Sequence, residues 1–122
     1  MPAIRRLFID GERWRERFIV LVTYMGSVNP ERVPLRGVEF RYLVKLAMAR
    51  ICTRGGWISM WELDDGPNQH RYIYLLRKAL PVKIETRYGT GRYRLRLPAR
   101  HIGFNDTTLR EFEDHRVQEM FV

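Results

Sequence analysis

The first third of the chain has the pattern of short β-strands. Apolar and β-branched residues gather in the runs IRRLFID, RFIVLVTY and ERVPL. Asp10-Gly11 and Asn29-Pro30, pairs typical of turns, separate these runs. The pattern predicts an antiparallel sheet over residues 4 to 36, with a turn at Asp10-Gly11.

The apolar spacing becomes helical at Val38. From there, one side of a predicted helix carries the apolar residues Phe40, Leu43, Val44, Ala47 and Ile51. Gly55-Gly56 is expected to end this helix, because glycine pairs interrupt helical backbone.

A second, short helix is predicted to begin after Ser59. The segment Ser59-Met60-Trp61-Glu62 matches a capping box, in which the serine hydroxyl accepts a hydrogen bond from the amide of Glu62. This helix is expected to end near Asp64-Asp65-Gly66.

The third predicted helix has two contrasting faces. It begins at Pro67 or Asn68 and ends at Leu80, because Pro81 cannot extend it. Ile73, Leu76 and Leu80 share the apolar face. The opposite face, flanked by Arg77, mixes cations, an aromatic ring and an imidazole without any acid: His70, Arg71, Tyr74 and Lys78.

A period of two returns after Pro81. The runs VKIET and RYRLRL predict a hairpin whose loop holds Tyr88 and the glycines Gly89 and Gly91. In its second strand Tyr93, Leu95 and Leu97 would face the core, and the alternating arginines Arg92, Arg94 and Arg96 would face outward.

Residues 105 to 121 are predicted to form one final helix, capped by Asn105, Asp106 or Thr107. Its apolar stripe is Leu109, Phe112, Val117 and Met120. The stripe can pack on the chain's own N-terminal sheet or on a second copy in a homodimer.

Charge distribution points to a polyanionic partner. The 122 residues carry a net charge of +8. Residues 41 to 100 hold thirteen basic and four acidic side chains, whereas residues 101 to 122 hold two and five. Because clustered charge creates a field while scattered charge mainly solubilises, the basic middle of the chain is the candidate binding region.

Other features of the sequence argue for a cytoplasmic protein. No apolar run approaches the roughly 18 residues needed to span a bilayer, and no signal peptide is recognisable. The single cysteine, Cys52, cannot form an internal disulfide and is expected to be buried. Trp57 and Trp61 are expected in the core.

The order of elements and several motifs resemble the OmpR/PhoB-type output domain of bacterial response regulators. The resemblance covers residues 4 to 97 and includes no receiver domain. Three short motifs carry it: an opening with Leu35, Glu39, Phe40 and Leu43, a helix end with Leu76, Arg77 and Leu80, and a hairpin with Thr86, Gly89 and Gly91.

The resemblance implies an α+β fold: a winged helix-turn-helix with an N-terminal antiparallel sheet, a three-helix core, a C-terminal β hairpin wing and, here, an extra C-terminal helix. Residues 1–100 would form the winged-helix domain and residues 101–122 a helical extension. The sequence departs from the family at the wing, where Tyr88 stands in the place of the usual arginine and Arg92 is an additional residue.

The function implied is sequence-specific binding of double-stranded DNA by a bacterial-type transcriptional regulator. Helix 68–80 would enter the major groove, and wing 86–94 would lie on the backbone or the minor groove. Arginine suits guanine and the amides suit adenine, so base contacts are expected from Asn68, Gln69, His70, Arg71 and Tyr74. Backbone or wing contacts are expected from Arg77, Lys78, Arg87, Tyr88, Arg92 and Arg94.

A winged-helix protein–protein interaction module without DNA binding is the alternative, and a separate regulatory protein is a possible partner of either. An enzyme is not expected. The glycines of the hairpin loop lack a third glycine and a following helix, and His70, His101 and His115 have no zinc-ligand spacing. No cofactor, metal or membrane partner is predicted.

Overall fold

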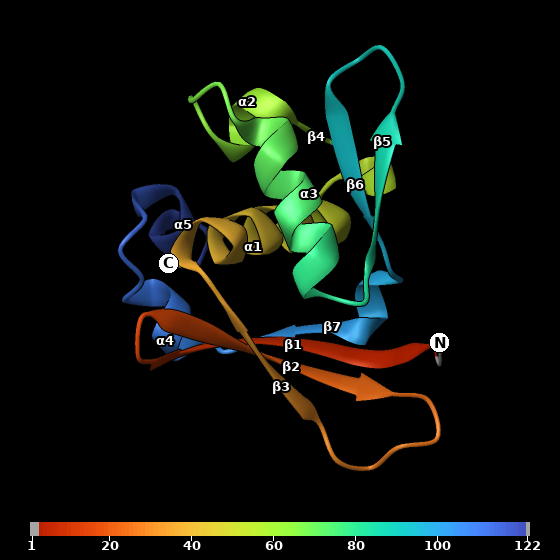
Figure 1. The fold of residues 1–122 in the computed structure, drawn as a ribbon, viewed down its shortest axis with the longest axis vertical. Helices are drawn as coiled ribbons and strands as arrows, with labels where there is room; N and C mark the ends of the chain where they lie inside the picture. The colour runs from red at the N-terminus through yellow and green to blue at the C-terminus, as the bar shows by residue number, and fades with distance from the viewer. Residues whose placement is uncertain (1–2, 122) are drawn as a thin grey trace.

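The computed structural model describes residues 3–121 and has a mixed α+β architecture. A four-stranded sheet forms one layer, the helices lie across it, and a smaller three-stranded sheet stands beside the helices (Figure 1). Among the described residues, no helix has both the length and the apolar character needed to span a membrane.

The larger sheet has the strand order β3-β2-β1-β7. The first three strands are antiparallel and confirm the β structure predicted for residues 4 to 36. The short β7 pairs with β1 in parallel, a pairing that sequence reasoning missed. The bounds are β1 Ile4–Trp14, β2 Arg17–Tyr24, β3 Glu31–Leu35 and β7 Ile102–Phe104.

The turn predicted at Asp10-Gly11 is wrong. β1 continues through Gly11 to Trp14, and the chain reverses at Arg15, which has a positive φ of 57°. Between Ile9 and Arg13 the register with β2 shifts, as it does at a β-bulge. Gly11 therefore supplies the positive φ of a bulge inside a strand rather than that of a hairpin turn.

Three helices form the centre of the molecule. Their bounds are α1 Gly37–Cys52, α2 Met60–Leu63 and α3 Gln69–Ala79, close to the predicted segments. The 3-10 turn η1 (Arg54–Gly56) follows α1, and its two glycines have positive φ. Ser59 caps α2 as expected, but its hydroxyl accepts from the amide of Trp61 at 3.3 Å rather than from Glu62.

The smaller sheet has the order β4-β6-β5. β5 (Lys83–Arg87) and β6 (Arg92–Arg96) form the predicted hairpin, and the two-residue β4 (Ile58–Ser59) adds a third strand that the sequence did not predict. Tyr93 and Leu95 are buried, which confirms the inward face of the alternating pattern.

The C-terminal region differs from the single helix predicted for residues 105 to 121. It contains the 3-10 turn η2 (Ala99–His101), then β7 and two short helices, α4 (Asp106–Arg110) and α5 (His115–Met120). The helix breaks because Phe112 packs against Phe18 and Phe40, while Asp114 accepts hydrogen bonds from the amides of Arg116 and Val117 and starts α5.

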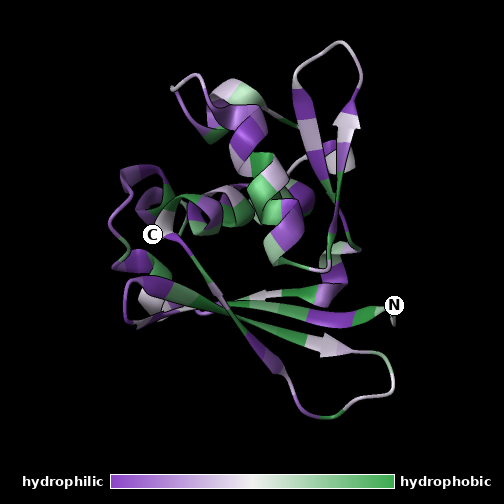
Figure 2. Ribbon diagram, viewed as in Figure 1, coloured by the Kyte–Doolittle hydropathy of each residue, from purple (hydrophilic) through white to green (hydrophobic). Residues whose placement is uncertain are grey.

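One core runs between the larger sheet and the helices. Apolar residues predominate where β1 and β2 face α1, whereas α3 and the β5–β6 hairpin carry many hydrophilic positions (Figure 2). Leu109, Phe112 and Val117 belong to this core, so most of the C-terminal stripe is buried within the chain itself. Cys52 and Trp61 are exposed, contrary to the sequence-based expectation.

Candidate nucleic-acid interface

Helix α3 has the two faces that its sequence predicts. Ile73 and Leu76 are buried in the core together with Leu80, the residue that ends the helix. The side chains predicted for the opposite face all lie in exposed positions: His70, Arg71, Tyr74, Arg77 and Lys78. The amine of Lys78 lies 4.8 Å from the centre of the Tyr74 ring, so these two side chains form one cation–π pair on the surface.

Two contacts hold α3 against the hairpin. Near the start of the helix, the hydroxyl of Tyr93 on β6 forms a hydrogen bond with Nδ1 of His70. Near its end, Arg77 donates from Nη2 to the carbonyl of Ile84 at 2.6 Å and to the hydroxyl of Thr86 at 2.8 Å. The helix and the hairpin therefore keep a fixed relative position over about two turns of α3. The two elements lie side by side in Figure 1.

Arg94 is committed to contacts within the chain. It donates from Nη2 to both carboxylate oxygens of Glu85 at 3.1 Å and from Nη1 to the carbonyl of Gly55 at 3.2 Å. Its guanidinium carbon lies 4.4 Å from the centre of the Trp57 ring. Because Glu85 neutralises its charge, Arg94 stabilises the hairpin, and little of its charge remains for a ligand.

The tip of the hairpin carries an exposed aromatic residue next to two exposed arginines. Tyr88 is 99% exposed. Arg87 and Arg92 are exposed cross-strand partners at the end of the hairpin, and the guanidinium carbon of Arg87 lies 5.9 Å from the centre of the Trp57 ring. Gly89 and Gly91 have φ of 76° and 63°, and the hydroxyl of Thr90 donates to the carbonyl of Arg87 at 2.8 Å to close the turn.

Gln69 does not lie on the outward face of α3. It is 1% exposed, and its Nε2 donates to the carbonyl of Asp64 at 2.9 Å. The amide therefore fixes the connection between α2 and α3, and the expectation that it contacts a base is corrected. Asn68, one residue earlier, is exposed and makes no capping hydrogen bond.

A hollow beside Arg71 reaches the start of α1. It has a volume of about 400 Å³, and its lining includes three arginines, Arg36, Arg41 and Arg71, and one acid, Glu39. Sequence reasoning missed Arg36 and Arg41, because they precede α3 by about thirty residues and join it only in the folded chain. In the sequence, the one indication of a shared role for Arg36 and Arg41 is that both lie near the start of the first predicted helix.

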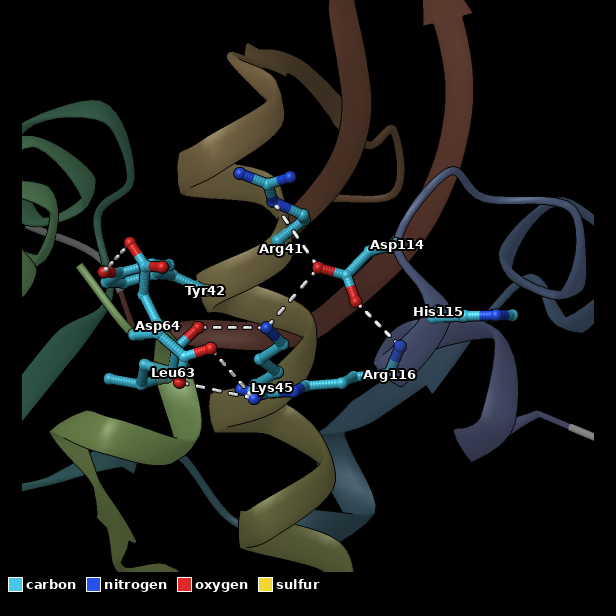
Figure 3. Close-up of a pocket in the computed structure, with 9 residues that line it drawn as sticks. Arg41, Tyr42, Lys45, Leu63, Asp64, Asp114, His115 and Arg116 are labelled. Atoms are coloured by element: carbon cyan, nitrogen blue, oxygen red, sulfur yellow. Dashed lines mark hydrogen bonds and ion pairs between the residues drawn. The ribbon is translucent and has the colours of Figure 1, made fainter.

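An ion pair between Lys45 of α1 and Asp114 connects the C-terminal segment to α1 (Figure 3). Lys45 is 4% exposed; its amine donates to the carbonyl of Leu63 at 2.9 Å and lies 3.5 Å from the carboxylate of Asp114. The same carboxylate lies 3.7 Å from Nε of Arg41. This segment leaves the outward residues of α3 exposed.

Burial and charge act in opposite directions on this ion pair. Burial lowers the pKa of Lys45, and Asp114 offsets that effect only in part. Burial alone would raise the pKa of Asp114, but Lys45 and the amides of Val117 and Arg116 bring that pKa below its ordinary value. The Asp114 carboxylate is thus held ionised. The ion pair stabilises the contact between the C-terminal segment and α1.

The described part of the chain contains no cluster of three or more histidine, cysteine, aspartate or glutamate side chains that could hold a metal ion. The structure places most of the predicted site residues in exposed positions at the start of α3, on α3 or on the hairpin: Asn68, His70, Arg71, Tyr74, Arg77, Lys78, Arg87, Tyr88 and Arg92. Internal contacts engage Gln69, Arg77, Arg94 and Nδ1 of His70. No protein-family model, curated protein or solved structure matches the chain.

Proposed function

We propose that this protein binds double-stranded DNA sequence-specifically through a winged helix-turn-helix of the OmpR/PhoB type and acts as a transcriptional regulator. Helix α3 is the recognition helix and enters the major groove. The β5–β6 hairpin is the wing and follows the adjacent backbone or minor groove.

One observation carries this proposal: the cationic outward side of α3 and the cationic tip of the hairpin belong to elements joined by direct contacts. The contact between His70 and Tyr93 and the bonds from Arg77 to β5 fix their relative position. A rigid arrangement of this kind reduces the entropy lost when several phosphates and bases are contacted together.

The residues divide by the kind of contact each is suited to make. Arg71 offers a bidentate donor for guanine, and Asn68 offers an amide for adenine. Tyr74 and His70 complete the base-reading surface. Lys78, Arg87 and Arg92 are suited to phosphates, whose neutralisation releases counterions and makes affinity depend strongly on salt.

Binding-site selection from random duplexes tests the proposal. The chain is expected to enrich one motif and to bind random duplex more weakly, with an affinity that falls steeply as salt rises. On the selected site, Arg71→Ala and Tyr74→Ala should each reduce the preference over random duplex by about 1–3 kcal/mol while retaining non-specific affinity.

A matched control separates base reading from general charge. Arg32→Ala removes one exposed cation from β3, in the other sheet. It should change neither the motif nor the preference. Absence of any duplex binding at low ionic strength would refute DNA recognition.

A protein–protein interaction module on the same fold is the second candidate. Trp61 favours it, because this side chain on α2 is 59% exposed, and a large exposed indole is typical of protein-binding hot spots. This candidate excludes DNA binding: it is supported if the chain binds no duplex at low ionic strength but binds a protein partner, and if Trp61→Ala loses that partner.

A further inference from the structure

A cavity of about 500 Å³ lies where the two sheets approach each other. One side is lined by Ile4, the first residue of β1, and by Met25, which directly follows β2. The other side is lined by Val82, which directly precedes β5, and by Leu97, which directly follows β6. The volume is within the range of small-molecule sites, and much of the wall is apolar.

The cavity also has a positive rim. Lys83 and Arg96 line it and are direct cross-strand partners on β5 and β6. Like charges placed opposite each other destabilise a strand pair. Glu85 offsets part of this charge, since it lies 4.0 Å from Nε of Arg96, but it is also bound by Arg94 at 3.1 Å. A bound anion would relieve this repulsion.

His101 also lines the cavity. Its Nδ1 is buried and has no hydrogen-bond partner among residues 3–121, and an atom covered in this way does not face the open space of the cavity. Lys83 and Arg96 are therefore the groups of this wall that can hold an anion.

We infer that this cavity binds a small organic acid with an apolar body. The apolar part lies between Ile4, Val82 and Leu97. The carboxylate lies at the rim, where it contacts Lys83 and Arg96.

The cavity adjoins the connection from α3 to the hairpin. Pro81 and Val82 line it and directly follow Leu80, the residue that ends α3. A ligand that favours one geometry of this connection therefore favours one placement of α3 relative to the hairpin. This regulatory step rests on the proposed DNA binding, whereas the ligand site itself does not.

Octanoate is a suitable probe, with octanamide as its neutral counterpart. Backbone amide NMR shifts of the free protein are recorded during titration with each compound. Octanoate should produce saturable shifts centred on Ile4, Val82, Leu97 and His101, and octanamide should bind about tenfold more weakly because it lacks the charge-assisted contacts. Absent, non-saturating or dispersed shifts would overturn the inference.

Charge variants test the rim. The double substitution Lys83→Gln with Arg96→Gln should weaken octanoate binding about tenfold or more and leave octanamide unchanged. Arg32→Gln, an exposed arginine of the other sheet, is the control and should alter neither compound. Equal octanoate affinity in the double variant and the control would overturn the assignment of the rim.

The regulatory step has its own measurement. Duplex affinity on the selected site is compared with and without saturating octanoate, and a change of severalfold that disappears in the double variant supports the coupling. Octanoate binding without any change in duplex affinity would leave the ligand site standing and refute the coupling. Absence of any duplex binding would refute the proposed function, but it would not affect the octanoate binding measured by NMR.

Discussion

At the scale of the residue, the role of each arginine is decided by its neighbours rather than by its charge. Arg92 and Arg94 stand two places apart on β6 and look equivalent in the sequence. Arg94 bonds to Glu85 and stacks on Trp57, whereas Arg92 is exposed at the hairpin tip opposite Arg87. One supports the hairpin, and the other is suited to a ligand.

Substituting these two arginines should separate stability from binding. Arg94→Ala is expected to lower the free energy of unfolding by about 1–2 kcal/mol, because it removes a charge-assisted hydrogen-bonded pair and a cation–π contact that are both partly solvated. Arg92→Ala should leave stability within about 0.5 kcal/mol and reduce the salt slope of duplex binding by about 1. Denaturant unfolding and salt titrations measure both. A large loss of stability in Arg92→Ala, or a reduced salt slope with unchanged stability in Arg94→Ala, would contradict these roles.

The ion pair of Lys45 and Asp114 also acts at this scale. Asp114→Asn keeps a capping side chain for α5 but leaves the buried Lys45 amine without its nearest counter-ion, and should cost about 3 kcal/mol. Glu113→Gln is the control, because Glu113 is exposed and pairs with Arg13 only at 3.8 Å. Its unfolding free energy should be almost unchanged.

The same pair predicts a pH dependence. Because the pKa of Asp114 is lower in the folded chain than its ordinary value of 3.8, the unfolded chain takes up this proton first on acidification. The stabilisation is therefore complete well above pH 3.8 and is lost as pH falls through the lower folded pKa. Denaturant unfolding at a series of pH values should show a shallower acid loss in Asp114→Asn than in the parent chain. Identical acid profiles would contradict the prediction.

At the scale of the element, β1 shows that a glycine expected in a turn can instead form a bulge inside a strand. Gly11 allows the strand to bulge while it remains paired, and Thr108 of α4 donates from its hydroxyl to the carbonyl of Asp10 at this point. A β-carbon on Gly11 would lie 3.0 Å from Oγ1 of Thr108 and 3.2 Å from Cζ of Phe40. The bulge thus joins the first strand to α4 and α1.

Gly11→Ala is consequently expected to destabilise the protein by about 1–3 kcal/mol, through its φ of 76° and through crowding against Thr108 and Phe40. Gly89→Ala is a useful comparison. Its φ is also 76°, but no atom lies within 4 Å of the added β-carbon. Thermal or denaturant unfolding should show a larger loss for Gly11→Ala. Equal losses would mean that packing at the bulge contributes nothing.

At the scale of the whole molecule, the C-terminal segment is part of the fold. β7 pairs with β1, and Leu109, Phe112 and Val117 are in the common core. Homodimerisation through residues 105–121 remains a prediction. It would have to use the exposed residues of this segment, because Leu109, Phe112 and Val117 are buried in the core.

Removal of residues 105–122 should therefore abolish cooperative unfolding rather than merely change the association state. The truncation exposes core surface of β1, β2 and α1, and three buried apolar side chains are each worth about 1.5–3 kcal/mol. Circular dichroism during thermal unfolding measures cooperativity, and sedimentation of the intact chain measures its mass. A truncated chain that unfolds as cooperatively as the parent would contradict this prediction.

Elements with strong, local periodicity could be predicted from the sequence. The helical spacing from Phe40 onward and the two faces of α3 were predictable, because burial of one face follows from 3.6 residues per turn. The hairpin followed from its alternation and its glycines. Helix breaks such as the one between α4 and α5 were not predictable, because long-range packing of Phe112 and Asp114 overrides a continuous helical pattern.

Which polar residues are available to a ligand depends on contacts that form on folding. Gln69, Arg77 and Arg94 appear in the sequence as members of a polar, basic surface, yet each is bound to groups elsewhere in the chain. Arg36 and Arg41 were ordinary helix-start residues until folding brought them beside Arg71. The physical reason is that periodicity fixes the face on which a side chain lies, whereas its partners are set by contacts between segments distant in sequence.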